Sequence, residues 1–255
     1  ALGIALPFAF AFFDRRRGVL AGTILVFSTL LFGACAMFTQ SRGGQLVFLA
    51  VIGVYFIRQV GIAKGILVGI VLAAPILLLG GRNDADADSS TLERLEAWYE
   101  HFQMFKESQG LGVGYGQFVH YHFLTAHSSY LLALSELGLP GLWLFTGVLY
   151  VSMKIPVAAM RGHARGQFPP IVGTWGTALF AAMAGTIVGI ALLSFNYKEI
   201  LWIYFGLCGA LYQAIRRHDP TFEVRVSRME AALMLLVDVA FVVGVRAYLF
   251  LKLGQ

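Results

Sequence analysis

The residues best suited to chemistry lie in one polar stretch, 80–129, between strongly apolar segments. Arginine stays charged and binds phosphate oxygens through two parallel hydrogen bonds, so Arg82 and Arg94 can hold a phosphate group. His127 ends the stretch, directly before an apolar run. Cationic residues near it would favour the neutral imidazole, which accepts a proton near neutral pH. Arg94 lies off the apolar face of its segment, where an arginine is more often solvated than bound to a ligand, so spacing alone does not assign it a role.

The composition places these residues in a membrane protein. Of the 255 residues, 58% are hydrophobic and 13% are charged, and the mean hydropathy is +0.73. An ordinary soluble domain carries about 25% charged residues. The net charge of +5 does not indicate nucleic-acid binding, because the basic residues lie in short loops between apolar runs. Cys35 and Cys208 lie inside apolar runs and are expected to be packing residues.

About 20 apolar residues in a helix cross the hydrocarbon core of a bilayer. The sequence therefore predicts an all-α, polytopic transmembrane bundle of seven or eight spans. The chain begins inside an apolar run, so we expect helices upstream of it. The expected spans are 1–13, 18–39, 44–57, 65–79, 139–157, 171–193 and 200–214, with 231–251 either spanning or lying in the interface.

The distribution of Lys and Arg predicts the orientation. Twelve of the 19 Lys and Arg residues fall on the side of the loops at Arg15–Arg17, Arg58, Lys64, Arg161 and Arg216, so these loops are expected to be cytoplasmic. The predicted organisation is transmembrane helices over 1–79, an extracytoplasmic functional loop over 80–129, transmembrane helices over 130–217, and a cytoplasmic segment with a final apolar helix over 218–255.

The outer loop contains three kinds of segment. Residues 92–106 carry apolar side chains at helical spacing and predict an amphipathic helix on the membrane surface. The run Gly110–Gly116 allows sharp turns and a close approach of backbone to a ligand. Tyr115, Phe118 and Tyr121 can stack on sugars or form an interfacial aromatic belt.

Three other motifs in the loop do not support a site. The glycine run lacks the strand and helix of a dinucleotide site and the pore helix of a potassium filter. Asp84, Asp86 and Asp88 lack the glycine and closing Glu of a calcium loop, and a solvated acidic loop is expected there. His120 and His122 have no convincing further metal ligand.

Several of these motifs, taken in order, resemble the O-antigen ligase and O-antigen polymerase superfamily. The most specific is His127-Ser128, followed after nine residues by Gly138-Leu139-Pro140-Gly141, with Ser128 where Asn is commoner. Thr39–Gly43, Arg94-x-x-x-Trp98 and Gly110-x-Gly112-x-Gly114 agree with it in order and topology. The resemblance covers roughly residues 18–215.

The resemblance implies a GT-C-like membrane glycosyltransferase that needs no metal and no nucleotide or other cofactor. Its donor would be a glycan on undecaprenyl diphosphate, and its acceptor a lipid A–core sugar for a ligase or a lipid-linked repeat for a polymerase. The protein would lie among the lipids of the bacterial inner membrane, with its active face periplasmic.

The expected roles follow from that reaction. Arg42 and Arg94 would hold the diphosphate, and His127 would activate the acceptor hydroxyl. Further substrate-binding candidates are Arg82, Gly112, Gly114, Tyr115, Ser128, Tyr130 and Lys198.

Two other functions are compatible with a cationic outer cavity. A transporter or channel for an anionic or lipid-linked substrate would place ionisable residues deep within several spans, whereas here they gather on one side. A structural membrane subunit would leave the pattern from His127 to Gly141 unexplained. Ligase and polymerase share donor and site, and we favour the ligase.

Overall fold

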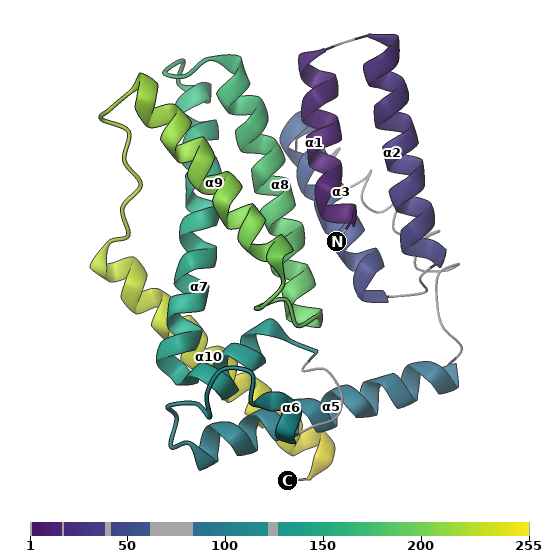
Figure 1. Cartoon of the computed structure of the whole chain (residues 1–255), viewed down its shortest axis with the longest axis vertical. Coiled ribbons are helices and arrows are strands. Elements are labelled where there is room, and N and C mark those ends of the chain that lie inside the picture. The colour runs from purple at the N-terminus through teal and green to yellow at the C-terminus, as the bar shows by residue number, and fades with distance from the viewer. Residues whose placement is uncertain (1, 17, 39–41, 62–83, 122–126, 255) are drawn as a thin grey trace. The chain divides into compact units, whose positions relative to one another are not determined.

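The computed structural model describes residues 2–16, 18–38, 42–61, 84–121 and 127–254. Within these ranges the chain forms helices joined by turns, with no strand. This agrees with the predicted all-α class. Figure 1 shows the helices α1 (Leu2–Arg15), α2 (Val19–Phe38), α3 (Arg42–Val60), α5 (Asp84–Glu107), α6 (Phe118–Tyr121), α7 (Ser129–Ala164), α8 (Pro170–Leu192), α9 (Glu199–His218) and α10 (Arg228–Leu253).

Among the described residues, four helices are long and apolar enough to cross a membrane: α2, α7, α8 and α10. Two apolar stretches, Ala5–Asp14 and Gly43–Ile57, are shorter. The predicted span 65–79 lies outside the described residues. The predicted span 200–214 forms α9, which is not among the four helices and ends in Arg216, Arg217 and His218. The length of α10 suits the spanning alternative for 231–251.

The chain divides into two compact units. The first contains Ala1–Arg82, Val151–Gly189 and Glu199–Val224. In it α1 lies against α2 and α3 (Figure 1), and a core that includes Phe10, Val51 and Tyr55 joins α1 and α3 to α8. A Cβ on Gly185 would lie 2.2 Å from Val51 Cγ2. A glycine is therefore needed where α8 meets α3, as is common in membrane helix packing.

The second unit contains Asn83–Tyr150, Ile190–Lys198 and Arg225–Gln255. Its core joins α5, α7 and α10 through residues that include Leu95, Leu131 and Leu249. A second face of α5 buries Ala97 and Met104 with residues that include Phe118. The helix α5 is thus packed on two faces within this unit.

The helix α5 begins at Asp84, so the prediction of an acidic loop over Asp84–Asp88 is wrong. Leu92 is 56% exposed, so the buried apolar face of α5 begins at Leu95.

Hydrogen bonds attach α10 to α7. Trp143 Nε1 donates to Ala231 O at 3.1 Å, and Thr146 Oγ1 donates to Asp238 Oδ2 at 2.8 Å. Ser227 and Glu230 form a capping box that starts α10. Asp238 is therefore held by a threonine of the neighbouring helix, a partner that the sequence did not indicate.

Candidate active site

The glycine run is bound to α7 at a break in that helix. Gly138 has φ 72° and ψ −173°, which interrupts the helical path. Leu139 N donates to Gly110 O at 3.1 Å, Val113 N donates to Ser135 O at 3.0 Å, and Gly114 N donates to Glu136 O at 2.9 Å. The backbone of 110–114 thus pairs with groups around the break.

The sequence around Gly138 explains why such partners are needed. In an uninterrupted helix, Ser135 O would accept from Leu139 N, and Glu136 O would accept from residue 140. Residue 140 is a proline and has no N–H, while Leu139 N is directed to the glycine run. Buried backbone groups must be paired, so the glycine run supplies what the broken helix lacks.

Gly112 and Gly138 make this close packing possible. A Cβ on Gly112 would lie 2.4 Å from Glu136 O, and a Cβ on Gly138 would lie 2.4 Å from Gly110 O. Both residues also have positive φ, as does Gly114 with φ 108°. The close approach at Gly112 is to α7. Gly114 has more room, because its nearest neighbour would be Gln117 Cγ at 3.5 Å.

Glu136 connects three segments through one buried carboxylate. The residue is 2% exposed. Phe118 N donates to its Oε1 at 2.9 Å, and the Tyr197 hydroxyl donates to its Oε2. Burial and the hydrogen bond to Glu136 raise the pKa of Tyr197 above its usual range. The ring of Tyr197 meets Tyr115 edge-on, with centroids 4.3 Å apart.

His101 supports the same region from α5. A hydrogen bond of 2.7 Å joins His101 Nδ1 and Ser135 Oγ, and the histidine is completely buried. Its ring stacks on Phe118 with centroids 4.3 Å apart. Phe118 is itself buried, so its ring packs inside the unit and is not available to a sugar.

Ser129 attaches the turn 193–198 to the start of α7. Its Oγ donates to Leu193 O at 2.7 Å and accepts from Phe195 N at 2.8 Å. Asn196 Nδ2 donates to Ser129 O at 2.8 Å. These bonds hold the turn that carries Tyr197 and the exposed Lys198 beside the first residue of α7.

His127 lies directly before this helix start. It is half-buried and has φ 52°, an uncommon conformation for a residue with a side chain. Ser128 is buried, and its Oγ accepts from Leu131 N at 3.4 Å, so it caps α7. Tyr130 packs against Phe145 and Phe241. Ser128 and Tyr130 thus help to build the helix start behind His127.

Arg94 and Trp98 present donors one turn apart on α5. Arg94 Nε and Trp98 Nε1 are both buried, and neither has a hydrogen-bond partner among the described residues. Residues four apart lie on one face of a helix. Arg94 and Trp98 therefore place two buried donors without a described partner on one face of α5.

Most of the predicted site residues lie in the second unit. It contains Arg94, Gly112, Gly114, Tyr115, His127, Ser128, Tyr130 and Lys198. Arg42 is the first residue of α3, in the first unit. Arg82 lies outside the described residues.

Sequence reasoning missed Glu136, Tyr197 and His101. One signal was present for Glu136, since an acidic residue inside the apolar run 131–137 is a candidate functional group by default. Tyr197 and His101 had no such signal, because their partners are distant in the chain.

A family model described as O-antigen ligase matches residues 27–146. The match supports an O-antigen ligase or polymerase family assignment for this segment. The O-antigen ligase match covers Arg94, the glycine run, His127 and the helix break at Gly138, which confirms the resemblance. Family members are glycosyltransferase-like enzymes, either ligases or polymerases. With the span-length helices, the match to the O-antigen ligase family indicates a multi-pass membrane protein. No curated protein and no solved structure matches the chain significantly.

Proposed function

We propose that the protein transfers a glycan from undecaprenyl diphosphate to a sugar hydroxyl of lipid A–core at the outer face of the inner membrane. The observation that carries this proposal is the pairing of the glycine run with the break at Gly138. Through it, the glycine run and the segment from His127 to Gly141 form one structure, within the region that matches the O-antigen ligase family.

The reaction needs a base and a site for a charged leaving group. The acceptor oxygen attacks the anomeric carbon of the donor sugar, and the bond from that carbon to the phosphate oxygen breaks. The hydroxyl proton passes to His127, and undecaprenyl diphosphate leaves with the bonding electrons. A positioned base contributes about 10²–10⁴-fold to such a reaction.

Arg94 is the best-supported group for the diphosphate within the second unit. Its unpaired Nε and the neighbouring Trp98 Nε1 would donate to phosphate oxygens. Each hydrogen bond to a charged group contributes about 1.5–3 kcal/mol. Arg42, in the first unit, and Arg82, outside the described residues, stay sequence-based predictions for diphosphate binding.

Aromatic and cationic groups stand near the same helix start. Tyr115 is 67% exposed and is held edge-on against Tyr197. Its face would stack on a sugar ring, with Gly114 beside it in the same turn. Lys198, in the turn fixed by Ser129, would contact a phosphate or a sugar hydroxyl.

Glycan analysis of a deletion strain tests the function. Loss of a ligase leaves polymer on undecaprenyl diphosphate, whereas loss of a polymerase leaves single repeats on lipid A–core. Substrate retained on the inner leaflet would instead indicate transport and would overturn the proposal.

Complementation tests the site. His127→Ala should fail to restore transfer, while His120→Ala, which changes an exposed histidine of the same loop, should restore it. Full transfer by His127→Ala at wild-type protein level would remove His127 from the mechanism.

A further inference from the structure

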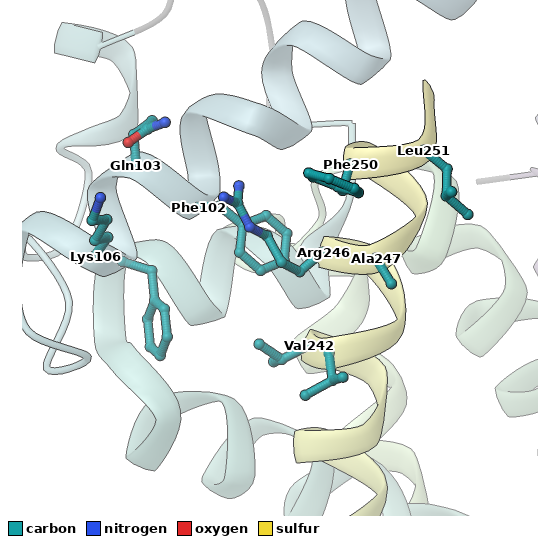
Figure 2. A pocket seen from close by; sticks show the side chains of 10 residues that line it. Phe102, Gln103, Lys106, Val242, Arg246, Ala247, Phe250 and Leu251 are labelled. Atoms are coloured by element: carbon teal, nitrogen blue, oxygen red, sulfur yellow. The ribbon is translucent and has the colours of Figure 1, made fainter. Parts of the chain in front are cut away.

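A pocket of about 760 Å³ lies between α5 and α10, within the second unit. Its size is in the range of about 300–1,000 Å³ that is usual for ligand sites. Phe102 and Phe105 of α5 and Val242 and Phe250 of α10 provide apolar walls. Figure 2 shows Lys106 and Arg246 coming from the two opposite walls, with Arg246 extending toward the α5 side.

We propose that this pocket binds an anionic membrane phospholipid. Its phosphate lies between Lys106 and Arg246, and one acyl chain lies along Phe102, Val242 and Phe250. This site is separate from the proposed transfer site, and the proposal does not depend on the transfer reaction.

The charge of the pocket selects an anion. Its lining contains two cations and no acidic residue. Among the described residues, neither Lys106 nor Arg246 forms an ion pair or a hydrogen bond through its side chain. Lys106 and Arg246 are both exposed. Long basic side chains commonly cover apolar surface with their stems and keep the charged group in water. A guanidinium and an ammonium together suit a phosphate group.

The walls of the pocket select a lipid over a soluble anion. The helix α10 is span-length and apolar, and only 11% of its most apolar window is buried. Phe250 and Leu251, at the pocket, are exposed. A free phosphate or sugar phosphate would leave these walls uncovered, whereas an acyl chain covers them and gains apolar burial. Basic pockets at membrane helices are known sites for anionic headgroups.

Photolabelling of the full chain tests the proposal. The purified protein is placed in phosphatidylcholine vesicles that contain a small fraction of phosphatidylglycerol with a photoactivatable acyl chain. We expect labelled peptides from 102–106 and 242–251, and competition by phosphatidylglycerol but not by added phosphatidylcholine. Equal labelling by a phosphatidylcholine probe would overturn the proposal. The proposal would also be overturned if undecaprenyl phosphate reduced the labelling and phosphatidylglycerol did not.

Charge variants test the two cations. Lys106→Gln combined with Arg246→Gln should lower labelling about tenfold, which corresponds to about 1.4 kcal/mol of binding free energy. Lys252→Gln removes a cation of the same helix that does not line the pocket, and it should label as the wild type does. Ala247→Trp, which fills the pocket and keeps both cations, should also abolish labelling. Unchanged labelling in either pocket variant would refute the assignment.

Discussion

Gly112 and Gly138 are in close backbone contact, and neither has room for a side chain. A Cβ on Gly112 would lie 2.5 Å from Gly138 N, closer than real Cβ contacts allow. The two residues are 26 positions apart in the sequence, as their numbers show. The glycine run and the helix break are therefore one structural unit, and a side chain at either position should separate them.

Replacing Gly138 by Ala should disrupt this unit. The added Cβ would meet Gly110 O at 2.4 Å, and the positive φ of 72° is unfavourable for alanine. We expect a loss of about 2–4 kcal/mol in the free energy of unfolding. The loss is measured as a lower melting temperature in detergent together with faster proteolysis of 110–121.

Gly147→Ala provides the matched control for Gly138→Ala. Gly147 lies in the same helix, and an added Cβ would meet nothing within 4 Å. Its melting temperature should equal or exceed that of the wild type. If Gly138→Ala and Gly147→Ala have the same melting temperature, the packing between the glycine run and the helix break does not stabilise the protein.

Glu136→Ala should loosen the segment after the glycine run. The substitution leaves the buried amide of Phe118 without its acceptor, which costs about 1–3 kcal/mol. Amide exchange at Phe118 should accelerate, whereas Glu136→Gln keeps an acceptor oxygen and should retain most of the protection. Equal exchange in wild type and Glu136→Ala would contradict this role.

Tyr197 should make the protein sensitive to alkali. Its pKa is raised by burial and by Glu136, whereas an unfolded tyrosine ionises near pH 10. The unfolded state therefore loses a proton that the folded state keeps, and stability falls as pH rises above about 10. Melting curves from about pH 9 to about pH 11 should show a steeper loss for wild type than for Tyr197→Phe. If the melting temperature of Tyr197→Phe falls with pH as steeply as that of the wild type, Tyr197 does not contribute to the alkaline loss of stability.

The all-α class and the span-length helices α2, α7, α8 and α10 could be predicted because they depend on local properties. Apolar length and basic flanks predict a membrane helix without knowledge of its neighbours. The resemblance to the family could likewise be recognised largely from residues close in sequence, above all from His127 to Gly141, and the family match over 27–146 includes them.

The connections within the site could not be predicted in this way. The pairing of Val113 with Ser135, and of Tyr197 with Glu136, depends on which helices pack together. Pro140 does carry a local signal, since its missing N–H leaves Glu136 O without a helical partner, but nothing local identifies Gly114 as the donor. The acidic segment at Asp84 was misjudged because solvated loops and helix starts favour the same residues.

Ser129→Ala should release the turn that carries Tyr197 and Lys198. It removes the acceptor of Phe195 N and the donor to Leu193 O, at a cost of about 1–3 kcal/mol. Amide exchange across 193–198 should increase. Ser194→Ala is the control, because Ser194 Oγ is buried without a hydrogen-bond partner among the described residues, so its loss should not be destabilising. Faster amide exchange across 193–198 in Ser194→Ala, but not in Ser129→Ala, would mean that Ser129 does not hold this turn.

Arg94→Lys should slow glycan transfer although it keeps the charge. Lysine lacks the forked guanidinium and the buried Nε, so it cannot reproduce two parallel bonds to a diphosphate. We expect about a tenfold loss of rate, equivalent to about 1.4 kcal/mol in the barrier. Transfer is measured in membranes from a lipid-linked donor at matched protein levels.

Two further variants show whether the loss with Arg94→Lys comes from the phosphate site. Trp98→Phe keeps the ring and removes the second donor of the same α5 face, so it should also lower the rate. Arg217→Lys, at the exposed end of α9, changes an arginine in the other compact unit and should not. Wild-type turnover by Arg94→Lys would mean that the guanidinium does not hold the leaving diphosphate. A loss in Arg217→Lys equal to that in Arg94→Lys would mean that the assay reports general destabilisation and not phosphate binding.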